Sequence, residues 1–362
     1  MKPNRRDYCQ FLLVTQKNYT QTYFAKHHAF FSHDAINRYM ASDNVTSAEV
    51  WGKVKSDVDF DEDGFIIFDD TVLDKSGARK IELAQIQYSG NTHGLVYGIG
   101  VVNCLYVNSK TGDCWIIDWR IFNPTVDGKT KLQHVMDMFD NAVISKQLPF
   151  KTVLMDSWYA TREIMMHLDR AGKIFYCPLK SNRKVDDSNG KGKDSYKSVD
   201  SLTWSPKEVI YGKQVKLREF PGDKKLRLFR VAANSRTEWV VTNDLSSDSD
   251  VSGNASESGH DSSVGKTDSP RITSFDAGLA CAVRWKIEQY HREVKQTLGM
   301  EKCQCRKASS QKTHIGCVSL AWHFFTKMAR SAGSTIYQLK ENLLSEYMKR
   351  ELANPTRVMP QV

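Results

Sequence analysis

The sequence predicts a mixed α/β fold, and three features of the chain support that prediction. Apolar runs with the length of strands occur at residues 65–68, 81–88, 95–107 and 114–122. Three consecutive strands joined by hairpins predict an antiparallel part of a sheet. Two more short runs, 152–155 and 174–177, each follow a segment whose apolar residues recur at helical spacing. Three strands, then helix, strand, helix and strand, are typical of a mixed sheet covered by helices.

Composition limits the class of protein. The chain has 362 residues and a formal net charge of +9, which favours a polyanionic partner without establishing one. No run approaches the ~18 apolar residues needed to cross a bilayer, so we expect no membrane partner. Eight scattered cysteines are typical of free thiols in a reducing compartment. One residue separates Cys303 from Cys305, which is too short a spacing to predict a zinc site.

Residues 1–60 read as helical. A run at 21–28 is followed by Ser32, which we predict to be the N-cap of a helix whose short apolar face includes Ile36. Two short helices, the second presenting Arg38 outward beside His33 and Asn37, resemble a helix-turn-helix that binds DNA. A plain helical bundle is the alternative interpretation.

Two predicted strands end in acidic residues. The run 65–68 leads into Asp69 and Asp70, and the run 152–155 leads into Asp156. Carboxylates at the ends of neighbouring strands meet at the edge of a sheet, where they repel each other unless a cation neutralises them. Oxygen ligands suit Mg²⁺ or Mn²⁺. Aspartates that begin turns are the competing explanation for each residue alone.

A third acid lies on a predicted helix near residues 283–295. Apolar residues recur there at helical spacing and form one stripe. A second stripe, about 100° away, holds one acid, Glu288, among titratable or basic residues, namely Arg284, His291, Arg292 and Lys295. This face is either a solvated surface with ion pairs or a carboxylate facing metal ions beside phosphate-binding cations.

These motifs resemble those of bacterial insertion-sequence transposases of the DDE class. In the relevant branch the signature is Tyr-x2-Arg-x3-Glu-x6-Lys, and Arg284, Glu288 and Lys295 match it, whereas Cys281 stands at the tyrosine position. Residues 68–75 are similar to the first acidic motif, in which the acid directly precedes threonine, so Asp70 is preferred over Asp69. Residues 153–156 resemble the second motif. The resemblance covers roughly residues 60–330.

The resemblance implies an RNase H-like fold and a catalytic triad of Asp70, Asp156 and Glu288. These three residues would hold two Mg²⁺ or Mn²⁺ ions that drive phosphodiester hydrolysis at transposon ends and then strand transfer. Arg284, Arg292 and Lys295 would bind backbone phosphates. The implied partner is double-stranded DNA, both transposon ends and target, bound by a homodimer in a bacterial cytoplasm, at the nucleoid. We expect His291 to be a surface residue and Trp158 to be packed at a helix start.

The predicted organisation has six parts. They are a helical DNA-binding region (1–60), the first part of an RNase H-like core (61–182), a β-rich insertion (183–244), a disordered linker (245–270), the second part of the core with the Glu288 helix (271–331) and a helical tail (332–362). Two alternatives remain open at this stage. One is an inactive, transposase-derived DNA-binding protein, and the other is a different RNase H-like nuclease.

Overall fold

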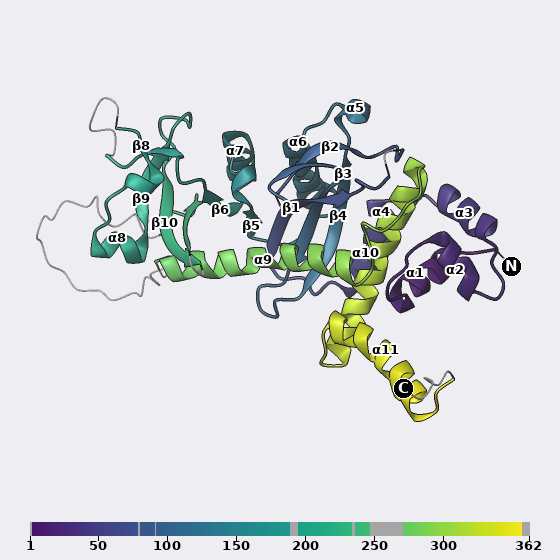
Figure 1. Cartoon of the computed structure of the whole chain (residues 1–362). Coiled ribbons are helices and arrows are strands. Elements are labelled where there is room, and N and C mark those ends of the chain that lie inside the picture. The colour runs from purple at the N-terminus through teal and green to yellow at the C-terminus, as the bar shows by residue number, and fades with distance from the viewer. Residues whose placement is uncertain are drawn as a thin grey trace, which may run out of the picture.

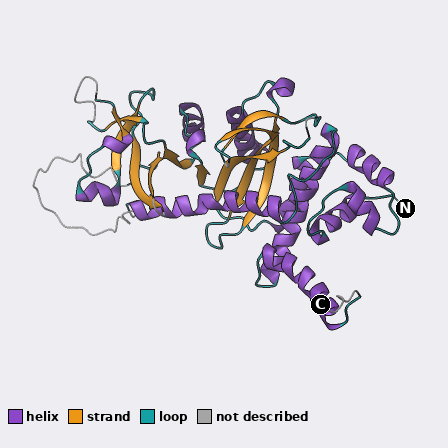
Figure 2. Ribbon diagram, in the orientation of Figure 1, coloured by secondary structure: helices purple, strands orange, loops and turns teal. Residues whose placement is uncertain are grey.

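The computed structural model describes residues 2–78, 80–90, 92–188, 195–233, 236–246 and 271–356. In these residues eleven strands form one mixed sheet, with helices at both ends of the chain, which confirms the predicted mixed α/β class (Figures 1 and 2). Of the linker predicted at 245–270, all but the first two residues lies outside the described part.

Four short helices begin the chain: α1 (Arg5–Val14), α2 (Gln21–His27), α3 (His33–Ser42) and α4 (Ser47–Val54), the last continued by a 3-10 turn, η1 (Lys55–Asp57). Ser32 caps α3 as predicted, because its hydroxyl accepts a hydrogen bond from the backbone N–H of Ala35. Helices α1, α3 and α4 all pack on α10 (Ala308–Ser331), far away in the sequence. The N-terminal helices are therefore held by a C-terminal helix (Figure 1).

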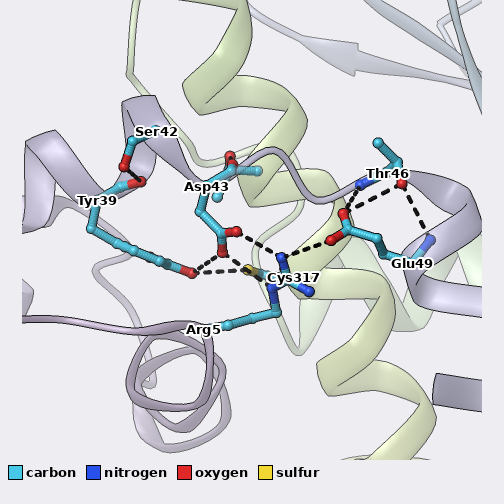
Figure 3. Close-up of polar contacts among 8 residues, drawn as sticks. Arg5, Tyr39, Ser42, Asp43, Thr46, Glu49 and Cys317 are labelled. Carbon is cyan, nitrogen blue, oxygen red and sulfur yellow. Dashed lines mark hydrogen bonds and ion pairs between the residues drawn. The ribbon is translucent and has the colours of Figure 1, made fainter. Parts of the chain in front are cut away.

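Polar contacts fix these helices to one another (Figure 3). The guanidinium of Arg5 in α1 donates to the carboxylate of Asp43 at 2.6 and 3.1 Å, and to Glu49 in α4 at 3.4 Å. Asp43 also accepts from the hydroxyl of Tyr39, which lies 3.7 Å from the thiol of Cys317 in α10. The Asp43 carboxylate thus joins α1 to α3, and Arg5 and Tyr39 extend these contacts to α4 and α10.

The centre of the sheet contains β1 (Phe65–Asp74), β2 (Gln85–Ser89), β3 (Gly94–Val107), β4 (Cys114–Phe122), β5 (Thr152–Met155) and β6 (Ile174–Leu179). Strand β3 lies between β4 and β1 and is antiparallel to both, and it also pairs antiparallel with β2. Strand β5 lies between β1 and β6 and is parallel to both. Apolar residues of β1, β3 and β5 are fully buried, so the core lies on both faces of this part of the sheet.

Short helices connect the central strands: α5 (Pro124–Asp127), α6 (Lys131–Asp140), a π-helix η2 (Asn141–Ser145), a 3-10 turn η3 (Ser157–Tyr159) and α7 (Arg162–Arg170). Helix α6 packs on β3 and β4, and α7 packs on β6. The threonine caps of α6 and α7 accept hydrogen bonds from the backbone N–H groups of Gln133 and Ile164.

The insertion extends the sheet past β6. Its elements are β7 (Lys184–Asp186), β8 (Lys197–Ser198), η4 (Val199–Ser201), α8 (Pro206–Tyr211), β9 (Lys213–Leu217), β10 (Leu226–Ala233) and β11 (Arg236–Thr242). Strand β11 pairs antiparallel with β6, so these strands continue the central sheet. The region predicted to be β-rich also contains a helix, because the Ser205 capping box and Pro206 start α8 there.

Three helices complete the chain: α9 (Ser274–Gln296), α10 and α11 (Ile336–Ala353). Helix α9 runs from the insertion across the strands towards α10 (Figure 1). A buried hydrogen bond secures its far end, because the Trp322 indole of α10 donates to Glu293 at 2.7 Å. None of the helices in the described ranges is long and apolar enough to cross a membrane.

Two strand limits differ from the sequence prediction. Strand β2 begins at Gln85 rather than Ile81, and β1 continues to Asp74 instead of stopping before Asp69. The extension of β1 follows from its pairing with β3, which holds each residue from Phe65 to Asp74 in register. Tertiary pairing therefore overrides the low strand propensity of the two aspartates.

Glycine 316 allows the close approach of α10 and the loop before α4. A Cβ at this position would lie 2.5 Å from the Cγ1 of Val45 and 2.8 Å from its carbonyl oxygen. We expect Gly316→Ala to lower the free energy of unfolding by about 1–3 kcal/mol through overpacking. Gly278→Ala is the matched control: its Cβ would meet only Val231 at 3.6 Å, so better helix propensity should leave stability unchanged or raised. Urea titration measures both, and equal effects would contradict the packing argument.

Candidate acidic site on the sheet

The site lies where α9 crosses the sheet. Helix α9 contacts β1, β5 and β6, whereas α6 and α7 pack on β3, β4 and β6. Strand β1 pairs with β5 up to Phe68 and Met155, and the next residues along the two strands are Asp69 and Asp156. In-register residues of parallel neighbours share a face, so this pairing puts Asp69 and Asp156 side by side.

Asp69 faces α9. Its carboxylate Oδ2 lies 3.9 Å from Nδ1 of His291, one turn after Glu288 on that helix. Burial raises the pKa of Asp69 well above its usual value, and the negative charges of Asp70, Asp156 and Glu288 raise it further. Asp69 thus lies within electrostatic reach of three other acids.

Glu288 is oriented by an arginine one turn earlier. Its carboxylate accepts a hydrogen bond from Nη1 of Arg284 at 3.0 Å. Burial raises the pKa of Glu288, and the charge of Asp156 adds to this increase, while Arg284 and the exposed Arg292 oppose it. No three His, Cys, Asp or Glu side chains of the described chain converge closely enough to hold a metal ion. In this structure Arg284 therefore holds the glutamate.

Asp70 lies on the other face of the sheet. Its two oxygens accept hydrogen bonds from Nζ of Lys131 at 2.5 Å and from the hydroxyl of Tyr159 at 2.6 Å. Lys131 begins α6, and Tyr159 belongs to the turn directly after Asp156. The structure therefore places Asp69 on the side of Asp156 and Glu288, although these carboxylates do not converge closely enough to hold a metal ion, and the Asp70 carboxylate is bound by Lys131 and Tyr159. Alternation along β1 is the reason, and the sequence prediction missed it because it ended the strand at Phe68.

His291 is buried, so the expectation that it lies on the surface was wrong. The amide of Asn103 in β3 lies 3.0 Å from its Nε2, and burial lowers the pKa of His291 to about 3. The ring is therefore neutral at pH 7. The Asn103 amide donates to Nε2, so the ring proton is on Nδ1, facing Asp69. The sequence feature that could have predicted this burial is the position of His291, one turn after Glu288 on the face of α9 that faces the sheet.

The predicted DNA-binding residues fall into two groups. Arg284 is buried and pairs with Glu288, and Lys295 donates to the carbonyl oxygen of Val72 at 2.8 Å, so both are engaged inside the protein. Arg292 and Arg38 are exposed. Trp158 is 47% exposed, so the expectation that it is packed was wrong. The centre of its ring lies 5.9 Å from the Lys131 ammonium, in the turn that follows Asp156.

Asp69 and Asp70 should have opposite effects on the free energy of unfolding at pH 7. Other acids surround Asp69, whereas Lys131 and Tyr159 bind Asp70. The pKa of Asp69 is higher in the folded than in the unfolded chain, so the free energy of unfolding falls as pH rises between the two values. We therefore expect Asp69→Asn to raise stability at pH 7 in EDTA, with a smaller effect at pH 4. Asp70→Asn leaves Lys131 and Tyr159 without an anionic partner and should cost about 1–3 kcal/mol. Denaturant unfolding of both variants measures this, and equal signs would refute the assignment of faces.

Comparison with known proteins supplies the family. The sequence profile of the transposase DDE domain matches residues 61–324, which include Asp69, Asp156 and Glu288. No curated protein matches the sequence. Two solved transposases are similar at low identity.

The first is the piggyBac transposase, in a cryo-EM structure of its synaptic complex with hairpin DNA. It is 12% identical, with a TM-score of 0.39 over 81% of this chain and 55% of that chain, so this chain spans about half its length. The second is the Drosophila P element transposase in a strand transfer complex, 11% identical, with a TM-score of 0.28 over 48% of this chain and 37% of that one. Because the family profile matches most of the chain, the chain belongs to the transposase DDE domain family.

Proposed function

We propose that this protein is a metal-dependent DNA transposase in which Asp69, Asp156 and Glu288 form the catalytic acids. The observation that carries the proposal is the position of Asp69, beside Asp156 and facing the Glu288 helix. Asp69 replaces Asp70 as the first acid, because Asp70 is neutralised by Lys131 on the opposite face. Membership of the transposase family supports the reaction class.

The acidic residues suit a divalent cation. The donors are carboxylate oxygens, which Mg²⁺ and Mn²⁺ prefer, and the raised pKa of Asp69 reflects repulsion that a cation would relieve. Asp69, Asp156 and Glu288 would hold the metal, and Glu288 would exchange its bond from Arg284 for it. When bound, divalent ions activate the attacking oxygen and stabilise the leaving 3′ oxygen of a phosphodiester.

Residues around the acids serve that chemistry. Neutral His291, whose Nδ1 lies 3.9 Å from Asp69, adds no positive charge that would compete with a cation there. The Asp70–Tyr159 hydrogen bond ties β1 to the turn after Asp156 and so sets the spacing of two catalytic acids. Exposed Arg292, one turn after Glu288, is placed to bind backbone phosphates. Arg284 acts through Glu288 and not on DNA directly.

We further propose an RNase H-like core. The order β4-β3-β1-β5-β6, with β3 antiparallel and β1, β5 and β6 parallel, supports this fold. In this proposal residues 61–182 and 271–331 form the core, residues 1–60 bind DNA with exposed Arg38, and residues 183–244 are an insertion. Cleavage at the ends of an insertion sequence, strand transfer and action as a homodimer on paired ends complete the proposal.

Cleavage of labelled DNA carrying the element's own ends tests the proposal. We expect nicking that requires Mg²⁺ or Mn²⁺, and loss of at least ~10²-fold in Glu288→Gln and Asp69→Asn, since several kcal/mol of transition-state stabilisation disappears. Asp70→Asn should retain measurable nicking.

Three outcomes would change the assignment. Nicking by Asp69→Asn but not by Asp70→Asn would return Asp70 to the site. DNA binding without cleavage by the wild type under either metal would favour an inactive DNA-binding relative, in which the Arg284–Glu288 pair is permanent. Cleavage without joining of the freed 3′ end would indicate a nuclease of another kind.

A further inference from the structure

A cleft without acidic residues in its described lining lies on the side of the sheet away from α9. Its volume is about 870 Å³, and it opens between α4 with η1 and the edge formed by β4 and the π-helix η2. The sequence prediction assigned no residue of this cleft to any site. Its volume is within the range of pockets that hold a ligand of several hundred daltons.

The lining of the cleft carries positive charge only. Lys55, Arg120 and Lys146 line it together with hydroxyl and amide side chains, and no aspartate or glutamate is among its described lining residues. One carboxylate, Asp118, is 2% exposed and lies behind the wall. Arg120 donates to Asp118 at 3.0 Å and Lys146 lies 3.7 Å from it. Asp118 carries one negative charge against the two positive charges that it contacts, so this wall of the cleft keeps a positive charge and attracts anions.

The cations are held in position before any ligand arrives. Asp118 also accepts a hydrogen bond at 3.1 Å from the amide of Asn141, the first residue of the π-helix. Lys146 follows the last residue of that π-helix, and its side chain is 9% exposed. A π-helix in place of continued α-helix re-aims side chains, and such irregularities are frequent at functional sites. The buried carboxylate thus anchors a fixed pair of cations at the wall.

Aromatic rings accompany these charges. The ammonium of Lys146 lies 5.7 Å from the centre of the Trp51 ring. Phe60 is 42% exposed, and its ring packs edge-on against buried Tyr106. An exposed aromatic ring beside cations suits a nucleic-acid strand, whose bases stack on rings while its phosphates meet the charges.

The register of the sheet relates the cleft to the catalytic acids. Arg120 of β4 is paired with Val102 of β3, and Val102 is paired with Asp70 of β1. The three residues form one rung and share a face, so Arg120 is about 10 Å across the sheet from Asp70 at the usual strand spacing. The cleft therefore lies at the level of the acids, on the opposite face and towards the β4 edge.

We propose that this cleft binds the backbone of a DNA strand outside the catalytic site, with phosphates at Lys55, Arg120 and Lys146 and a base stacked on Phe60. The inference rests on the proposed function for the identity of the polymer. A free inorganic anion would use the charges but not the exposed ring, and the two measurements below separate these ligands.

The first measurement is the salt dependence of DNA binding by the full chain in EDTA, with a labelled duplex and a labelled single strand. We expect Lys55→Ala to weaken binding and to reduce the slope of log K against log salt by about 0.9 for the duplex or 0.7 for the single strand. Lys53→Ala is the matched control, because Lys53 is an exposed lysine of α4, two residues before Lys55, that does not line the cleft. Equal changes in the two variants, or no change in either, would overturn the proposal.

The second measurement compares Phe60→Ala with Phe324→Ala, a phenylalanine of similar exposure, 45%, on α10. Loss of stacking should weaken single-strand binding roughly 5- to 150-fold in Phe60→Ala only. Inorganic phosphate that competes with DNA while Phe60→Ala binds like the wild type would identify a simple anion site instead. These assays need no cleavage, so their failure would leave metal-dependent nicking, and its loss in Glu288→Gln, as separate support for the transposase function.

Discussion

Consecutive side chains of an extended strand leave it on opposite faces, so Asp69 and Asp70 of β1 cannot both face α9. The pairing of β1 with β5 decides which one does, because it places Asp69 level with Asp156. A shift of the β1–β5 register by one residue would turn Asp70 towards α9 and Asp69 away from it. It would also bury the Asp69 carboxylate on the side where Lys131 and Tyr159 now bind Asp70. The arrangement of both faces therefore depends on one register.

That register is stabilised from the face away from α9. Tyr159 is 1% exposed, and its hydroxyl joins Asp70 on β1 to the turn that follows β5. The parallel pairing of these strands covers only four residues, so a bond just past its end limits fraying where the acids lie. The repulsion between acids on the α9 face destabilises the same arrangement. Proteins retain such unfavourable interactions at functional sites when the surrounding contacts are strong enough to hold the residues in place.

Much of this architecture could be predicted from local pattern. Buried strands at β5 and β6, the Ser32 cap and the apolar stripe of α9 all follow from periodicity and cap chemistry, and each is present. The extent of β1 could not be predicted, because ten residues are held by pairing with a distant part of the chain. The faces of Asp69 and Asp70 depend on that extent. The contact of His291 with Asn103, 188 residues away in sequence, is one that no local pattern can indicate.

Helix α9 is one continuous helix of 23 residues with two sets of neighbours. Near its start it contacts α8 and β10 of the insertion, and further along it crosses β1 and β5. Gly278, beside Val231 of β10, is about 15 Å from Glu288 along the axis. A straight helix of this length transmits a tilt at one end as a displacement at the other. The insertion and Glu288 thus share one helix, so a change in the angle of α9 at the insertion would displace the Glu288 carboxylate.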